Sequence, residues 1–375
     1  FMRVLIQPDY VYRQKLKLIT TNNVLETLQE VIEAKRGTVC IFCNSIDSID
    51  SFYRLIPELS NACTFCSEDG QYKLWKGNRR KKSMMITELE RYNFFTSRFY
   101  SAVDILCKNP PHVIFVSDLY GAAQSVIDPA TEAIQIIGRF RGGVNSVTHI
   151  ASIRPELECM SSSEIDHWIQ GASTIFNGWK AQLARTTNIG ERTLLQEAIG
   201  ENSYLPYLDE NGKPDSFLIA NFYEKEQVKR LYTSADLLHL AYEQTGYFVF
   251  SHEERLMPVS DNERMAIQHR LAKKKRAELI VRKLEEMEKM SRATDKKIQK
   301  RYQRMLMNLI TSTADRYIYD CFCRFGAEFV READYNENKL RTALNVSSEH
   351  TIKKSGQMRT YIQRAFPVGC LLYTS

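Results

Sequence analysis

Several features are missing from this 375-residue chain, and each absence excludes a class of protein. No apolar run approaches the roughly 20 residues that a membrane-spanning helix needs, so we expect no membrane contact. No secretory signal opens the sequence, and it has no internal repeat or low-complexity segment. Its nine cysteines are an odd number among apolar neighbours, which favours reduced thiols and a cytoplasmic location over a disulfide framework.

The composition that is present indicates a globular protein. Hydrophobic residues make up 43% and charged residues 26%, with a net charge of +6. The chain opens Phe-Met-Arg, from which we expect an interior piece of a longer protein. Residues 367–375, PVGCLLYTS, do not continue the preceding pattern, so a non-native addition and a frayed terminus both stay open.

Two cysteine pairs have the spacing of a four-cysteine zinc site. They are Cys40-x-x-Cys43 and Cys63-x-x-Cys66. The first pair lies in the apolar run TVCIFC, which reads as a buried strand, and residues three apart on a strand point to opposite faces. We therefore expect core cysteines and no bound metal, with zinc as the alternative.

Short apolar runs alternate with helical patterns in the first part of the chain. The runs at 38–43, 92–97, 112–117 and 147–153 are separated by helical patterns, among them 23–35, 48–59 and 131–140. The runs lack polar alternation, which is typical of a parallel sheet covered by helices on both faces. Residues 1–155 are therefore predicted to form one α/β domain.

Residues 156–375 are predicted to be mainly helical. The capping box SSSE at 161–164 begins an amphipathic helix, and Asn211-Gly212 indicates a small hairpin. Residues 231–247 are predicted as a further helix. Residues 262–310 form one long helical pattern, or two, rich in lysine and arginine.

Polar residues gather in three segments that we interpret as strand exits, because ligands of doubly wound sheets bind beyond the carboxyl ends of the strands. Taken singly, these residues could cap helices, form surface ion pairs or lie in a solvated turn. The first segment has Asn44 and Ser45, the second has Thr96, Ser97, Arg98 and Asp104, and the third has Gln135, Gly138, Arg139 and Arg141.

The order of these segments resembles the second RecA-like domain of superfamily 2 helicases and translocases. CIFCNS resembles the family's motif IV, TSRFYSAVDI its motif V, and QIIGRFR its motif VI. The resemblance covers residues of about 35 to 155, and motif VI is its most specific part.

The resemblance implies a site shared between two RecA-like lobes, in which ATP and Mg²⁺ are bound mainly by the first lobe. Arg139 and Arg141 are then the arginine-finger candidates, and Gln135 and Gly138 lie near the nucleotide. Asp104 is implied to orient motif VI or to contact the ribose. Nucleic acid, DNA rather than RNA, is implied to contact the remaining five residues, which are Asn44, Ser45, Thr96, Ser97 and Arg98.

The sequence also departs from the family pattern. Arg139 and Arg141 are two residues apart where three is common, so either could be the finger, and Ala102 stands where glycine is frequent. The chain contains neither a Gly-x-x-x-x-Gly-Lys-Ser/Thr motif nor an acidic Asp-Glu box, so it should not hydrolyse ATP alone. It is either the C-terminal half of a longer helicase or a nucleic-acid-binding or interaction protein with a degenerate helicase fold.

Positive charge is concentrated at two places. Residues 264–304 hold fifteen lysines and arginines against five acidic residues, and GNRRKKS at 77–83 is a smaller cluster. A basic helix of this kind binds phosphates, or else it is a solvated helix with internal ion pairs.

Overall fold

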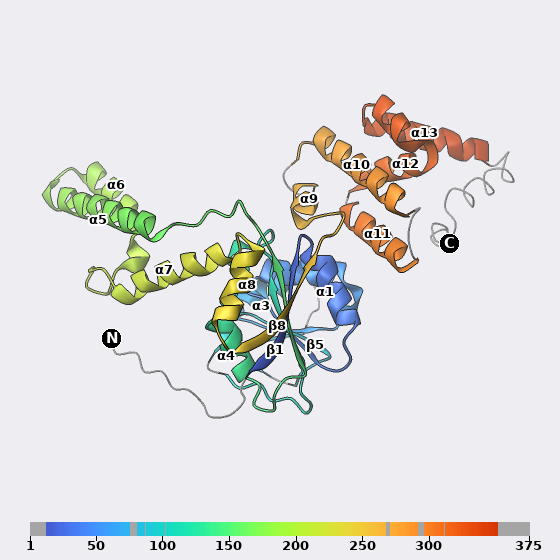
Figure 1. Ribbon diagram of the computed structural model, residues 1–375. Coiled ribbons are helices and arrows are strands. Elements are labelled where there is room, and N and C mark those ends of the chain that lie inside the picture. Colours follow the sequence, from blue (N-terminus) through green and yellow to red (C-terminus); the bar gives the residue numbers. More distant parts are fainter. Residues whose placement is uncertain are drawn as a thin grey trace. The chain divides into compact units, whose positions relative to one another are not determined.

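The computed structural model describes residues 13–75, 81–86, 88–101, 103–267, 271–291, 296–310 and 312–351 (Figure 1). One sheet holds eight strands, all parallel, in the order β4-β3-β5-β2-β6-β7-β1-β8. The strands are β1 Gln14–Thr21, β2 Val39–Phe42, β3 Cys63–Phe65, β4 Lys81–Ser83, β5 Tyr92–Phe95, β6 His112–Ser117, β7 Ser146–Ser152 and β8 Phe248–Arg255. The predicted α/β class is therefore confirmed.

Helices follow most strands and then continue into the C-terminal region. They are α1 Val24–Glu33, α2 Ile46–Leu55, α3 Glu68–Trp75, α4 Glu132–Gly138, α5 Ser162–Arg185, α6 Ile189–Gly200, α7 Ser216–Leu231, α8 Ala235–Gln244, α9 Asp261–Met265, α10 Lys273–Ser291, α11 Lys296–Leu309, α12 Thr313–Glu332 and α13 Glu337–Thr351. None of the described helices is both long enough and apolar enough to cross a membrane.

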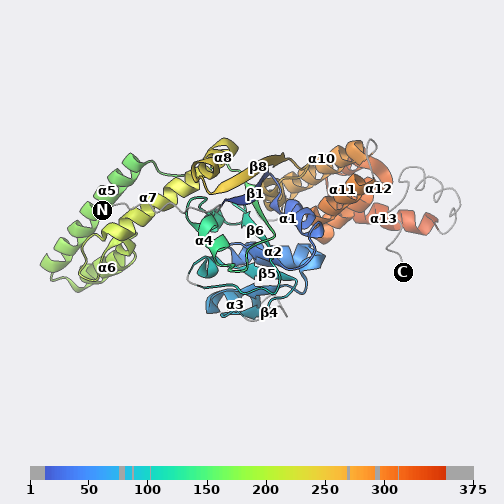
Figure 2. The same ribbon diagram turned by 60° about the horizontal axis from the view of Figure 1, so that its bottom comes forward.

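The sheet has a separate apolar core on each face, because successive strand residues point to opposite sides. Leu18 and Phe42 belong to the core shared with α4 and α8, while Ile19 and Ile41 belong to the core shared with α1 and α2. Figure 1 and Figure 2 show these helices on the two sides of the strands. Both faces of each central strand are buried, which explains the continuous apolar runs in the sequence.

The cysteine pairs are divided between these two cores. Cys40 and Cys63 lie in the core with α4, whereas Cys43 and Cys66 lie in the core with α1 and α2. The prediction that Cys40 and Cys43 point to opposite faces is confirmed. The four thiols lie on two sides of a sheet, so they do not form the four-cysteine site that the spacing suggested.

The compact α/β unit extends a hundred residues beyond the expected boundary at 155. β8 pairs with β1 along its whole length, from Gln14 with Phe248 to Thr21 with Arg255. The first compact unit of the chain ends at Arg255, the last residue of β8. Long-range pairing therefore places residues 156–255 in the first unit. The second unit begins at Leu256 and has its own apolar core, formed by α10 to α13 and the segment before them.

The turn expected at Asn211-Gly212 forms, but a helix follows it. Gly212 has φ +71°, and Leu208 and Pro214 make an isolated antiparallel bridge. The segment after the turn is α7, which Asp215 caps by accepting hydrogen bonds from the backbone N–H groups of Phe217 and Leu218. Residues 231–247 contain α8, as predicted. The pattern at 262–310, predicted as one helix or two, holds α10 and α11, and the short α9 begins one residue before it, at Asp261.

Candidate functional site

Asn44, Ser45 and Thr96 lie where β2 and β5 end, at the carboxyl edge of the sheet. The Cys43 N–H donates to the Phe95 carbonyl, so the two strand exits are adjacent. Ser45 is buried and caps α2 by accepting from the Ser48 N–H at 3.1 Å, while the Thr96 hydroxyl donates to the Phe65 carbonyl at 3.4 Å. These two side chains stabilise the fold. Among the described residues, the half-buried Asn44 side chain makes one long hydrogen bond, from Nδ2 to the Gln124 carbonyl at 3.5 Å.

Ser97 and Arg98 are exposed at the same edge. They belong to the short 3-10 turn Ser97–Phe99, which is anchored by the buried ring of Phe99. The structure therefore brings all five residues predicted for nucleic acid to one edge, and leaves Ser97 and Arg98 as the most accessible.

Asp104, Arg139 and Arg141 form a second cluster. Asp104 Oδ1 lies 3.1 Å from Arg141 Nε and 3.9 Å from Arg139 Nη1. The Ile105 N–H donates to the Arg139 carbonyl at 2.8 Å, and Arg139 Nε donates to the Gln135 carbonyl at 3.1 Å. The Arg141 side chain is 64% exposed and that of Arg139 22%, so one guanidinium is free to reach outward and the other is partly enclosed.

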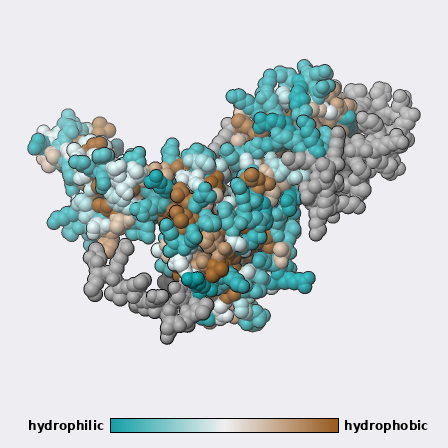
Figure 3. Space-filling view, in the orientation of Figure 1, coloured by the Kyte–Doolittle hydropathy of each residue, from teal (hydrophilic) through white to brown (hydrophobic). Residues whose placement is uncertain are grey.

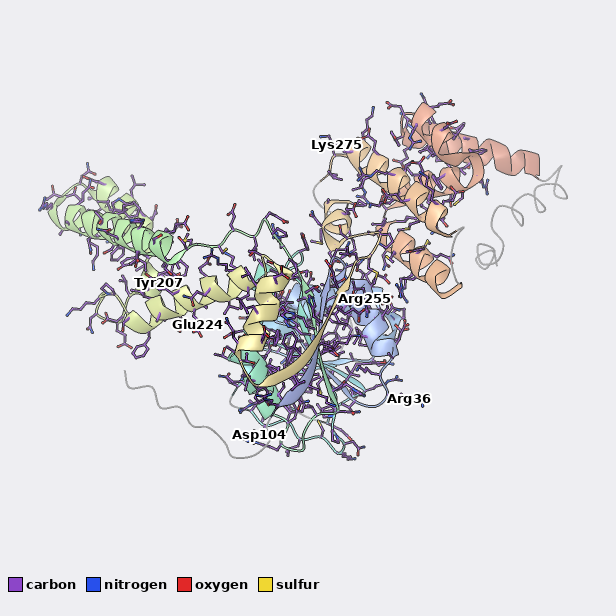
Figure 4. The ribbon with its side chains drawn as sticks, in the orientation of Figure 1. Arg36, Asp104, Tyr207, Glu224, Arg255 and Lys275 are labelled. Carbon is purple, nitrogen blue, oxygen red and sulfur yellow. The ribbon has the colours of Figure 1, made fainter. Side chains whose placement is uncertain are left out.

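The position of this cluster corrects the sequence interpretation, which placed it at a strand exit. Arg139 and Arg141 follow α4 and precede β7, whose first residue Ser146 pairs with His112, the first residue of β6. Because α4 carries the chain about 10 Å back across the face of the sheet, its end lies at the amino edge. In Figure 4, Asp104 lies at the end of the sheet opposite Arg255, which ends β8.

Gln135 and Gly138 accompany the arginines on α4. Both residues are exposed, and a Cβ added at Gly138 would meet no atom within 4 Å. Only the backbone of Gln135 takes part in the cluster, through its carbonyl. Ala102, which marked a departure from motif V, lies outside the described residues.

A buried polar network joins the sheet to the helices that cover it. His149 on β7 is fully enclosed, with Nε2 3.0 Å from the Ser117 hydroxyl and Nδ1 2.8 Å from the Tyr242 hydroxyl. Ser117 also donates to the Tyr232 hydroxyl, which lies 2.6 Å from the Ile127 carbonyl. Burial lowers the pKa of His149 to about 3, so the ring is neutral at physiological pH.

A pocket of about 630 Å³ opens beside Asn44 and was not found from the sequence. Its walls come from the loop after β6 and from one face of α7, the helix that carries Glu224 in Figure 4. Six α7 residues line it, and five of them recur at helical spacing: Asn221, Glu224, Lys225, Val228 and Lys229, with Glu226 as the sixth. The helical spacing of these residues was visible in the sequence. The sequence did not show that this face of α7 lies near Asn44, because the two are far apart along the chain.

Several of the cations in the basic helical region form ion pairs with acidic residues of the same unit. On α10, Lys274 pairs with Asp334 at 2.7 Å, Lys283 with Glu263 at 2.7 Å, and Arg276 with Asp315. Figure 3 shows hydrophilic colour over most of the visible face of these helices. Lys273, Lys275 and Lys289 on α10 are exposed and form no ion pair with the part of the chain that the structure describes. Of the cluster at 77–83, residues 77–80 lie outside the described residues.

No protein-family model matches the chain, and a search of curated proteins finds no significant match.

Proposed function

We propose that this chain is the C-terminal RecA-like half of an ATP-dependent nucleic-acid helicase or translocase. In this role it supplies an arginine finger to an ATP site completed by an N-terminal lobe, which would bind the Mg²⁺ and most of the nucleotide. The observation that carries the proposal is the cluster of Asp104, Arg139 and Arg141, two guanidinium groups held by one carboxylate on an accessible edge.

The chemistry of arginine suits this role. A guanidinium is planar and permanently charged, and it stabilises the negative charge that develops on a transferring phosphoryl group. The ion pair between Arg141 and Asp104 is solvent-exposed, so exchanging it for a phosphate has a small energetic cost. Asp104 is a positioning residue in this scheme, because it holds both side chains before the nucleotide arrives.

The position at the amino edge is compatible with this mechanism. In open α/β sheets, a ligand binds outside the carboxyl ends of the strands that hold it. Here the other lobe would hold the triphosphate, and this lobe needs only to present a guanidinium toward it. The carboxyl edge, with Ser97 and Arg98 exposed, then stays available to the nucleic-acid backbone. The cytoplasmic location remains part of the proposal, and the eight described cysteines are all free thiols.

The test is ATP turnover by Arg139→Ala and Arg141→Ala, made in the protein together with its N-terminal lobe and measured with saturating nucleic acid. We expect the finger variant to lose about 10³-fold in turnover, with nucleic-acid affinity little changed. The larger loss identifies the finger. Arg185→Ala, at the exposed end of α5, is the matched control and should behave as the unaltered protein.

Full turnover in both variants would reject the motor function. If nucleic acid were still bound in that case, the protein would be a nucleic-acid-binding protein with a degenerate helicase fold, which is the alternative left open by the sequence.

A further inference from the structure

The pocket beside Asn44 is built from three parts of the first unit. Asn44 comes from the exit of β2, Gln124, Val126 and Asp128 come from the loop after β6, and α7 closes the other side. This loop is tied down, because the Tyr232 hydroxyl bonds both the N–H and the carbonyl of Ile127. The pocket is therefore a fixed feature of the carboxyl edge.

Its polar groups fall into two sets. Some are already engaged, since Glu226 binds the Met160 N–H at 2.7 Å and Lys229 at 3.3 Å, and Glu132 accepts from the Asp128 N–H at 3.0 Å. Asn221, Glu224 and Lys225 on α7 make no side-chain hydrogen bond or ion pair with the described residues. The open groups are thus an amide, a carboxylate and an ammonium on one helical face.

The charge of the lining argues against a phosphate in the pocket. Four carboxylates, Asp128, Glu132, Glu224 and Glu226, face two lysines, Lys225 and Lys229. Burial raises the pKa of Glu132, the hydrogen bond from the Asp128 N–H partly opposes this, and the neighbouring Asp128 and Glu224 carboxylates add to the rise. An anion would therefore be repelled, while a ligand that donates hydrogen bonds to carboxylates would be favoured.

A nucleobase has this chemistry. Amide side chains pair with base edges, and a carboxylate accepts from the exocyclic amine of cytosine or adenine. Ala123, Val126 and Val228 provide apolar surface for the base faces. Asn44 belongs both to the pocket and to the residues predicted to lie along the nucleic-acid backbone, so a strand at this edge would pass the pocket opening.

We propose that this pocket takes an unstacked base of single-stranded nucleic acid and favours cytosine or adenine over thymine, with Glu224 and Asn221 as the specificity-determining residues. This inference rests on the proposed function, because it needs a strand at the carboxyl edge. It adds base selection to an interface whose other contacts are to phosphates.

The test is the affinity of the chain for single-stranded homopolymers of deoxycytidylate, deoxyadenylate and deoxythymidylate of equal length. We expect the first two to bind about tenfold more tightly than the third. Glu224→Ala and Asn221→Ala should reduce that ratio towards one, while binding of the thymidylate polymer stays the same. Glu197→Ala, at an exposed position of α6, is the matched control and should keep the full ratio.

Three other results would overturn the inference, and they can be told apart. Binding of all three polymers with equal affinity would reject the base pocket and leave the proposed function standing. No binding of any polymer would reject both the pocket and the strand path. If a polyamine or a lysine-rich peptide bound in a Glu224-dependent way without competing with nucleic acid, the pocket would be a cation site.

Discussion

The two edges of the sheet differ in what their polar residues do. At the carboxyl edge, Ser45 caps a helix and Thr96 bonds a neighbouring strand, so the fold already uses them. At the amino edge, Asp104 contacts both Arg139 and Arg141, and Asp104 and Arg141 stay accessible while Arg139 is partly enclosed. Residues that share one motif, such as Thr96 and Asp104, are thus separated onto opposite edges. The comparison shows that a motif gives an order along the chain and does not by itself fix the edge of the sheet at which each of its residues lies.

Among the three tests of this comparison, the largest effect is expected at the amino edge, from Asp104→Asn. The variant loses the charge that orients both arginines, and we expect ATP turnover with the N-terminal lobe present to fall roughly 30-fold, about 2 kcal/mol. Thermal stability should be nearly unchanged, because the exposed ion pair contributes little to folding.

Asp47→Asn, at the start of α2 on the carboxyl edge, is the control and should keep full turnover. Unchanged turnover in Asp104→Asn would remove the functional distinction between the edges, and a large loss of stability would make the cluster structural.

The two edges keep their places only while the sheet between them stays folded. The pH dependence of the free energy of unfolding tests the buried His149 network at the middle of the sheet. An unfolded histidine takes up a proton below about pH 6.5, whereas the folded His149 does so only near pH 3. Unfolding therefore takes up a proton in this window, and stability falls as pH falls through it. Between pH 8 and pH 5 we expect the histidine to remove about 2 kcal/mol from the free energy of unfolding.

Denaturant unfolding of the chain across this pH range gives the measurement. His149→Gln has no titrating ring, so its free energy of unfolding should depend less on pH by that amount. An equal pH dependence in both proteins would show that His149 is not the group responsible.

The smallest effect is expected at the carboxyl edge, from Arg98→Ala. Loss of one phosphate contact should weaken nucleic-acid binding about fivefold and reduce the slope of log affinity against log salt by about one. ATP turnover at saturating nucleic acid should not change. A loss of turnover with unchanged affinity would instead assign Arg98 to the nucleotide site and break the division between the edges.

Much of the fold could be predicted because it follows from local patterns. The runs TVCIFC, YNFF and HVIFVS are apolar throughout since both faces of their strands are buried, and Cys40 and Cys43 point to opposite cores for the same reason. β8 was missed because FVFSHEER is an edge strand with several charged residues, whose partner lies more than two hundred residues earlier.

The misplacement of Arg139 and Arg141 has a different cause. The strand predicted at 147–153 already implied that residues just before it enter the sheet at the amino edge. The rule that ligands of open α/β sheets bind beyond the carboxyl ends of the strands had favoured the opposite edge. The pocket could not have been predicted in the same way, since it needs the position of α7 against the loop after β6.

The amino-acid sequence by itself determined the alternation of strands and helices, the parallel sheet with two buried faces, and the order of the polar segments. These depend on periodicity over a few residues, which the chain carries locally. Only the tertiary structure decided that β8 joins β1, that the arginines meet Asp104, and that α7 faces Asn44. Those contacts join residues 35 to more than 200 positions apart, and such contacts are set by the packing of the whole unit rather than by any one segment.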